Sequence, residues 1–312
     1  MKSTNLILAL AIGAGIVVAS CKPKESSSNL DSNVESHNQD VNNTKSESDN
    51  LNTDVNNALI NISGFGKNGE VQAYSICGAV IDSSHQFDSP NPYITFTFDG
   101  QTNCDGRIRS GVVKVKLIQG TAWTDVGAKL EITHTAYKVV YTYHNNHFLV
   151  FNGIKYLTNV NGYDPWQVWL GLQTVSIRER ATNLTVDYEN GQTAHWSVAR
   201  LSSWSMSNSG YQINATVNGD TVVGGKTLDS WGVTRFGTNF TTEMIQPWKS
   251  NTTCGLWRPT SGKYTSVTDS FSITATLGVN TSGNQISSGC AHGLKLDWTL
   301  GVHSGNAVIG YW

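Results

Sequence analysis

Apolar and polar residues alternate along most of the chain after about residue 90. In the segment YITFTF, Ile94, Phe96 and Phe98 alternate with threonines. An alternation with a period of two is typical of β-strands that bury one face and expose the other. The same period recurs at 113–117, 184–188, 211–217, 271–277 and 294–300.

Pairs of Asp or Asn with Gly lie between these segments and predict tight turns, because they favour the positive backbone angles of short hairpins. They occur at Asp99-Gly100, Asn152-Gly153, Asn161-Gly162, Asn190-Gly191 and Asn218-Gly219. Helical periodicity is absent beyond the N-terminal apolar run. The predicted fold class is therefore all-β, with antiparallel hairpins or a meander forming a large twisted sheet or a sandwich.

The N-terminal 20 residues have the pattern of a secretory signal peptide, with Lys2 followed by an apolar run too short to span a bilayer. The run ends in Val18-Ala19-Ser20-Cys21, which resembles a bacterial lipobox. We therefore predict acylation of Cys21, with palmitate among the attached chains. Lys22, rather than Asp, follows the cysteine, which favours a lipid anchor in the outer membrane.

Residues 21–57 are predicted to be the lipidated N-terminus and a disordered tether. Residues 22–57 are rich in Ser, Asn, Asp, Glu and Lys and contain no aromatic residue, so they offer little apolar surface to bury. Residues 58–312 form the all-β region, and a division into two lobes, 58–235 and 236–312, stays open.

Four cysteines remain once Cys21 is assigned to the anchor: Cys77, Cys104, Cys254 and Cys290. An even number in an exported domain indicates disulfides. Three pairings are open, and we favour the sequential one, Cys77–Cys104 with Cys254–Cys290. The segment TNCDGRIRSG (102–111) is then a stapled hairpin, whose turn is Asp105-Gly106 and whose Arg107 and Arg109 pair with carboxylates or carbonyls.

The lipobox, the polar tether, YITFTFDGQTNCDGRIRSGVVKVKL and ENGQTAHWSVARLSSW together resemble a group of uncharacterised β-rich lipoproteins of Bacteroidota. The motif at 104–111 is the specific part of the resemblance. It implies a β-rich fold and an envelope location, and it implies no catalytic residue.

Motifs for catalysis or cofactor binding are absent from the sequence, and we expect no catalytic residue, cofactor or metal. GDTVVGGKT (219–227) lacks the first glycine of a phosphate-binding loop. His144 and His147 flank a predicted turn, where exposed histidines are more common than a metal site. The net charge of −2 and the lack of a basic patch argue against nucleic acid as a partner.

Aromatic residues suggest one alternative, because exposed rings on a rigid sheet can stack on sugars. We single out Trp169 and Trp257 among ten tryptophans as candidate ligand contacts. The favoured function is a membrane-anchored envelope lipoprotein with a non-catalytic structural, adhesive or protein-binding role. The alternatives are a carbohydrate-binding surface lipoprotein and a hydrolase without a readable motif. A partner other than the membrane, whether glycan or envelope protein, and the oligomeric state stay open.

Overall fold

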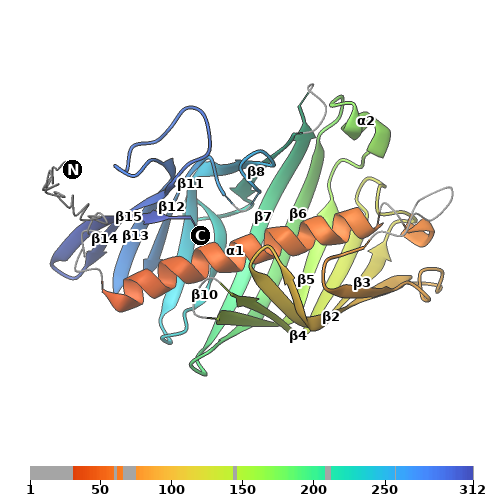
Figure 1. Ribbon diagram of the computed structural model, residues 1–312, viewed down its shortest axis with the longest axis horizontal. Coiled ribbons are helices and arrows are strands. Elements are labelled where there is room, and N and C mark those ends of the chain that lie inside the picture. The colour runs from red at the N-terminus through yellow and green to blue at the C-terminus, as the bar shows by residue number, and fades with distance from the viewer. Residues whose placement is uncertain are drawn as a thin grey trace, which may run out of the picture.

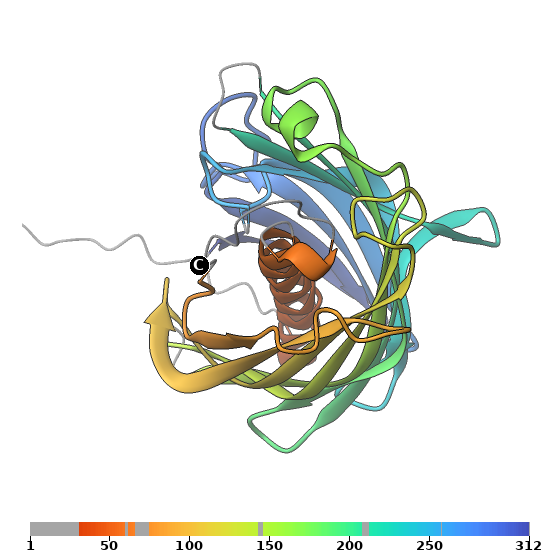
Figure 2. The same ribbon diagram turned by 90° about the vertical axis from the view of Figure 1, so that its right-hand side faces the viewer.

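One curved sheet encloses one long helix in the computed structural model of the protein, which describes residues 31–59, 62–65, 75–142, 146–207, 212–256 and 258–311. Within these residues, fifteen antiparallel strands form a single sheet. Figure 1 shows helix α1 lying along this sheet, and Figure 2 shows the sheet curving around the helix. The predicted all-β class and antiparallel pairing are confirmed.

Most strands follow chain order across the sheet, from β1 at one edge to β15 at the other. Strand β8 pairs with β7 and β11, and β9 pairs with β10. The strands are β1 (Ala79–Asp82), β2 (Tyr93–Cys104), β3 (Arg107–Gln119), β4 (Lys129–Tyr141), β5 (His147–Asn159), β6 (Val175–Tyr188), β7 (Thr193–Met206), β8 (Ile213–Gly219), β9 (Thr221–Val223), β10 (Lys226–Val233), β11 (Asn239–Asn251), β12 (Ser261–Thr268), β13 (Phe271–Val279), β14 (Gly293–Leu300) and β15 (His303–Gly310). The helices are α1 (Ser32–Leu59), the short 3-10 helix η1 (Ser63–Phe65) and α2 (Pro165–Trp169).

The sheet continues from β10 to β11, across the boundary between 58–235 and 236–312 where a division into two lobes was left open. Strand β10 ends at Val233, and β11, which begins at Asn239, pairs with it antiparallel. Both segments therefore belong to one sheet.

A row of bulges crosses five neighbouring strands and bends the sheet. Two of the predicted turns lie in this row, and that prediction is wrong: Asp99-Gly100 lies inside β2 and Asn152-Gly153 inside β5. A bulge needs the same positive backbone angle as a tight turn, and the two glycines supply φ of 71° and 120°. Register shifts in β2 to β6 lie between Asp99 and Asn103, Ser110 and Val112, His134 and Tyr137, Asn152 and Lys155, and Ala181 and Leu184.

Residues 32–57, predicted to be a disordered tether, are helical, so that prediction is wrong for this segment. Asp31 caps the helix, since its carboxylate accepts a hydrogen bond from the backbone N–H of Asn33 at 2.9 Å. Sparse apolar residues on one side of the helix are fully buried: Val34, Val41, Leu51, Val55 and Leu59. The sheet supplies the apolar partners that the segment lacks in its own sequence.

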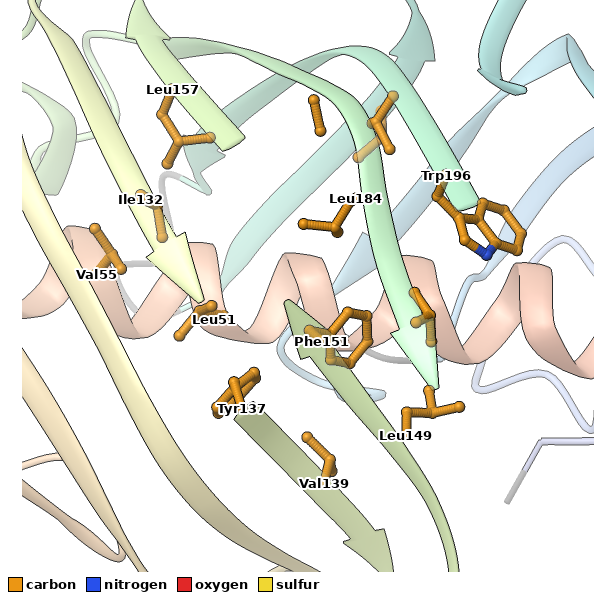
Figure 3. Packing of buried hydrophobic residues seen from close by; sticks show 14 of the residues in the cluster. Leu51, Val55, Ile132, Tyr137, Val139, Leu149, Phe151, Leu157, Leu184 and Trp196 are labelled. Atoms are coloured by element: carbon orange, nitrogen blue, oxygen red, sulfur yellow. The ribbon is translucent and has the colours of Figure 1, made fainter. Parts of the chain in front are cut away.

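The hydrophobic core lies between α1 and the concave face of the sheet. Figure 3 shows Leu51 and Val55 of α1 beside Ile132, Tyr137 and Phe151 of β4 and β5. The alternating strand residues predicted to face inward form most of the sheet's contribution. The buried ones are Ile94, Phe96, Phe98, Val113, Val115, Leu117, Leu184, Val186, Tyr188, Ala215, Val217, Phe271, Ile273, Ala275, Leu277, Leu294, Leu296 and Trp298.

Candidate functional site

Charged and polar side chains run along the whole interface between α1 and the sheet. A buried charge is costly unless it is paired and hydrogen-bonded. The helix contributes the buried side chains of His37, Asn38, Asp40, Thr44, Lys45, Glu47 and Asn52. The sheet contributes those of Arg109, His134, Lys155, Glu179, Arg200 and Asp229, and the turn after β10 contributes Arg235. Several of these charges are paired between the helix and the sheet, and the pairs fix the helix in place.

Glu179 of β6 is the centre of the middle part of this interface. Its carboxylate accepts hydrogen bonds from Ser48 Oγ at 2.6 Å and Asn52 Nδ2 at 3.2 Å, and Lys155 Nζ lies 3.5 Å away. Burial alone would raise the pKa of Glu179, but the Lys155 and Arg200 cations outweigh it and lower the pKa to about 2. The carboxylate is therefore ionised in the folded protein, and it joins α1 to two strands.

Near the first turns of α1, Asp40 forms a two-pronged ion pair with Arg235. Arg235 Nε donates to Asp40 Oδ2 at 2.8 Å, a second bond joins Nη2 to Oδ1, and the guanidinium lies 3.6 Å from the centre of the Tyr188 ring. Burial raises the pKa of Asp40 to about 7, although Arg235 opposes this shift. This pair fixes the N-terminal half of α1 against the turn that follows β10.

The two arginines of the 102–111 hairpin contact the other half of the helix. Arg109 Nη1 lies 2.6 Å from Asp54 Oδ2, and Arg107 Nη1 lies 3.3 Å from Glu47 Oε2. Tyr137 donates a hydrogen bond to the same Glu47 carboxylate at 2.6 Å. The predicted pairing of both arginines with carboxylates or carbonyls is confirmed, and the carboxylates belong to the segment that was expected to be disordered.

The hairpin itself has the predicted form. Cys104 pairs with Arg107 across a turn in which Asp105 and Gly106 have φ of 53° and 82°. Cys77 is bonded to Cys104, and Cys254 is bonded to Cys290, so the sequential disulfide pairing is confirmed.

A cleft of about 210 Å³ opens beside α1. One side is the polar face of the helix. The other side comes from the second half of the sheet and from the loop after β11. The lining includes Gln39, Asn42, Asn43, Lys45, Ser46, Asp49 and Asn50 of α1, Asp105, Arg107 and Tyr141 of the first half of the sheet, and Val217, Trp248, Lys249, Leu256, Pro259, Ile309 and Tyr311 of the second half.

The two tryptophans proposed as ligand contacts are not brought to this cleft by any described contact. Trp257 lies outside the described residues, although its neighbours Leu256 and Pro259 line the cleft. Trp169 belongs to α2, and its side chain lies outside the described part. The local structure is a helical turn: Asp164 caps it by accepting from the Trp166 N–H at 2.8 Å, and Pro165 occupies the first turn.

The remaining candidates from the sequence are the lipidation site and the two histidines at the predicted turn. Cys21 and the signal peptide lie outside the described residues, as does His144, and His147 Nδ1 lies 2.9 Å from the Glu189 carboxylate. Among described residues, no three His, Cys, Asp or Glu side chains are grouped so that they could hold a metal ion. In the same part of the chain, each helix is too short or too polar to cross a bilayer.

Comparison with known proteins gives no match to a family model, a curated protein or a solved structure.

Because His134 is buried, we expect acid to destabilise the protein. Burial and the Lys155 cation lower the pKa of His134 from 6.5 to about 3. The unfolded chain takes up this proton first, so the stability contributed by neutral His134 is lost as the pH falls below about 6.5. We expect the free energy of unfolding to decrease less from pH 6.5 to pH 4.5 in His134→Gln than in the wild-type protein, as measured by urea titration.

The prediction concerns the difference in pH dependence between His134→Gln and the wild-type protein, because Asp40 changes the free energy of unfolding in the opposite direction. Its raised pKa means that the folded protein holds this proton more tightly, which favours folding as the pH falls through about 7. Asp40 is present in both proteins and cancels in the difference. Parallel pH profiles would contradict the prediction.

Proposed function

We propose that this protein is a lipid-anchored envelope lipoprotein that acts by binding and not by catalysis. The cleft beside α1 carries the binding part of this proposal. Its helix face consists mainly of side-chain amides and a hydroxyl, which are suited to recognition through hydrogen bonds. The interior carboxylates Glu179 and Asp40 are engaged in ion pairs, Glu179 with Lys155 of the neighbouring strand and Asp40 of α1 with Arg235 of the turn after β10.

The lipobox at Cys21 supports the anchor. Nine residues connect Cys21 to Asp31, and the ten steps between neighbouring Cα atoms, fully extended, would span at most about 35 Å. The anchor would therefore hold the start of α1 close to the membrane surface. Because α1 is bound to the sheet by ion pairs, the lipid would be attached to a rigid core rather than to a long flexible tether.

Removal of the acylated residue tests the anchor. We expect Cys21→Ala to incorporate no labelled palmitate and to leave the membrane fraction, because two or more acyl chains are needed for stable anchoring. Palmitate labelling and membrane fractionation of the full chain in a bacterial host give the measurement. Ser20→Ala, which keeps a small residue before the cysteine, is the matched control and should stay membrane-bound. A Cys21→Ala protein that stays membrane-bound to the wild-type extent would refute the lipoprotein assignment.

A further inference from the structure

We propose that the cleft beside α1 binds a neutral saccharide. This proposal rests on the proposed binding function and names the chemical class of its ligand.

The helix side of the cleft presents a stripe of hydrogen-bonding groups, Gln39, Asn43, Ser46 and Asn50. Their spacing of four, three and four residues places them on one face of α1. All four are half-buried, and within the described residues Asn43, Ser46 and Asn50 make no side-chain hydrogen bond. The stripe therefore has donors and acceptors that the fold does not use.

The opposite side of the cleft is largely apolar. Val217, Leu256, Pro259 and Ile309 line it together with the half-buried Tyr311. A sugar ring has this same division, since it presents C–H groups on its faces and hydroxyls around its edge. A ring placed between the two sides would contact the apolar wall and hydrogen-bond to the helix.

Two further polar atoms of lining residues are without partners. Trp248 Nε1 and Tyr141 Oη are buried and, in the described part of the protein, have no hydrogen-bond partner. A buried polar atom without a partner destabilises the folded protein. A ligand hydroxyl group both donates and accepts, so it would satisfy either atom.

The charges around the cleft favour a neutral ligand. Lys45 Nζ lies 2.6 Å from Asp49, and Arg107 is paired with Glu47. Of the lining residues, Lys249 and Asp105 remain, and they are exposed and opposite in sign. An acidic ligand would find no unpaired cluster of cations here.

The helix side of the cleft offers an extended peptide no main-chain hydrogen bonds. Peptides bound in an extended form commonly gain affinity from main-chain hydrogen bonds to a strand edge. The main-chain groups inside α1 are already bonded within the helix, so this side of the cleft offers side chains only. Amide side chains both donate and accept, as sugar hydroxyls do.

A binding screen with cleft variants tests the proposal. Full-length protein purified in detergent is applied to an array of neutral cello-, malto- and chito-oligosaccharides, acidic oligogalacturonides and a pool of random peptides. We expect binding to a neutral oligosaccharide, and a loss of about tenfold or more in affinity in the double variant Asn43→Ala, Asn50→Ala. Calorimetry with the best oligosaccharide gives the affinity.

Asn33→Ala is the matched control, because Asn33 is exposed on the same helix and does not line the cleft. It should keep the wild-type affinity. Alanine favours helix over asparagine, so the double variant should stay folded, and its thermal unfolding shows this directly. Saccharide binding that the double variant leaves unchanged would overturn the assignment of the site.

A failure of this proposal is distinguishable from a failure of the proposed function. Peptide binding that is lost in the double variant would overturn the saccharide and keep the cleft as a binding site, and preference for oligogalacturonides would overturn the neutral class. Absence of binding to every oligosaccharide on the array would overturn the proposal. None of these results affects the membrane release expected for Cys21→Ala.

Discussion

Replacement of Glu179 by alanine should lower the free energy of unfolding by about 3–5 kcal/mol, because it removes one partner of a buried ion pair. The side chains of Glu179 and Lys155 are 3% and 2% exposed. Without the carboxylate, the Lys155 ammonium would stay buried with a single hydrogen bond, to Ser48 Oγ. Ser48 and Asn52 of α1 would lose their acceptor at the same time.

Urea unfolding at pH 7 gives the measurement, with Glu131→Ala as the control. Glu131 lies on β4 between the buried residues Leu130 and Ile132, so it faces outward, and its contact with Tyr156 is 3.5 Å long. Its loss should change stability by no more than about 0.5 kcal/mol. The double variant Glu179→Leu, Lys155→Met removes both charges and should recover part of the loss. Equal effects of Glu179→Ala and Glu131→Ala would mean that the interface between α1 and the sheet carries little of the stability.

The strands could be predicted because each one repeats a local pattern. In β2, Ile94, Phe96 and Phe98 alternate with polar residues and are at most 4% exposed. The sulfur pairing could be predicted because each bridge joins residues close in sequence. By contrast, a glycine with positive φ occurs in both turns and bulges. Gly100 and Gly153 were therefore predicted to lie in turns, whereas they lie at bulges within strands.

Helix α1 could not be predicted from its own residues. Ten positions separate Val41 from Leu51, and none of the residues between them is apolar. A segment of this composition has too little apolar surface to fold by itself. It becomes helical in this protein because arginines 55 to 195 residues away, Arg107, Arg109 and Arg235, pair with its carboxylates.

The strand sequences nonetheless indicated that a polar segment packs against the inner face of the sheet. Glu179 lies in phase with the buried residues Ile177 and Ala181, and Arg200 lies in phase with Trp196 and Val198. Charges at inward positions of a strand require opposite charges or hydrogen-bonding groups inside the molecule. For Glu179 the amide-rich segment 32–57 supplies two of these groups, Ser48 and Asn52, whereas Arg200 is paired with Asp229 of β10.

The cleft had no such signal, because it is assembled from distant parts of the chain. Asn43 lies on α1, Trp248 on β11, and Tyr311 follows β15. Tryptophans were proposed as ligand contacts from their local surroundings alone. The helix side of the cleft is instead lined mainly by amide side chains, whose role depends on the position of the helix in the fold.

Cys104→Ser should destabilise the protein by about 2–5 kcal/mol, the usual cost of losing a native disulfide. For a chain of this size the melting temperature should fall by roughly 5–15 °C. The bridge closes a segment with a sequence separation of 27. Loss of the bridge should also weaken the attachment of α1, because Arg109 connects the bridge to the helix. One of its nitrogens donates to the Cys77 carbonyl at 3.0 Å, and the other pairs with Asp54 of α1.

Differential scanning calorimetry gives the melting temperature, and a thiol assay in denaturant without reductant gives the state of the cysteines. Cys77, Cys104, Cys254 and Cys290 should yield almost no free thiol in the wild-type protein, and Cys104→Ser should free the thiol of Cys77. Arg109→Ala should destabilise more than Arg107→Ala, because the side chain of Arg109 is 6% exposed and that of Arg107 is 21% exposed. A free Cys104 in the native protein that alkylates rapidly would reverse this conclusion. The neighbouring arginines would then stabilise a reactive thiolate. The hairpin would be an active site, and not a disulfide-bonded hairpin whose arginines bind α1.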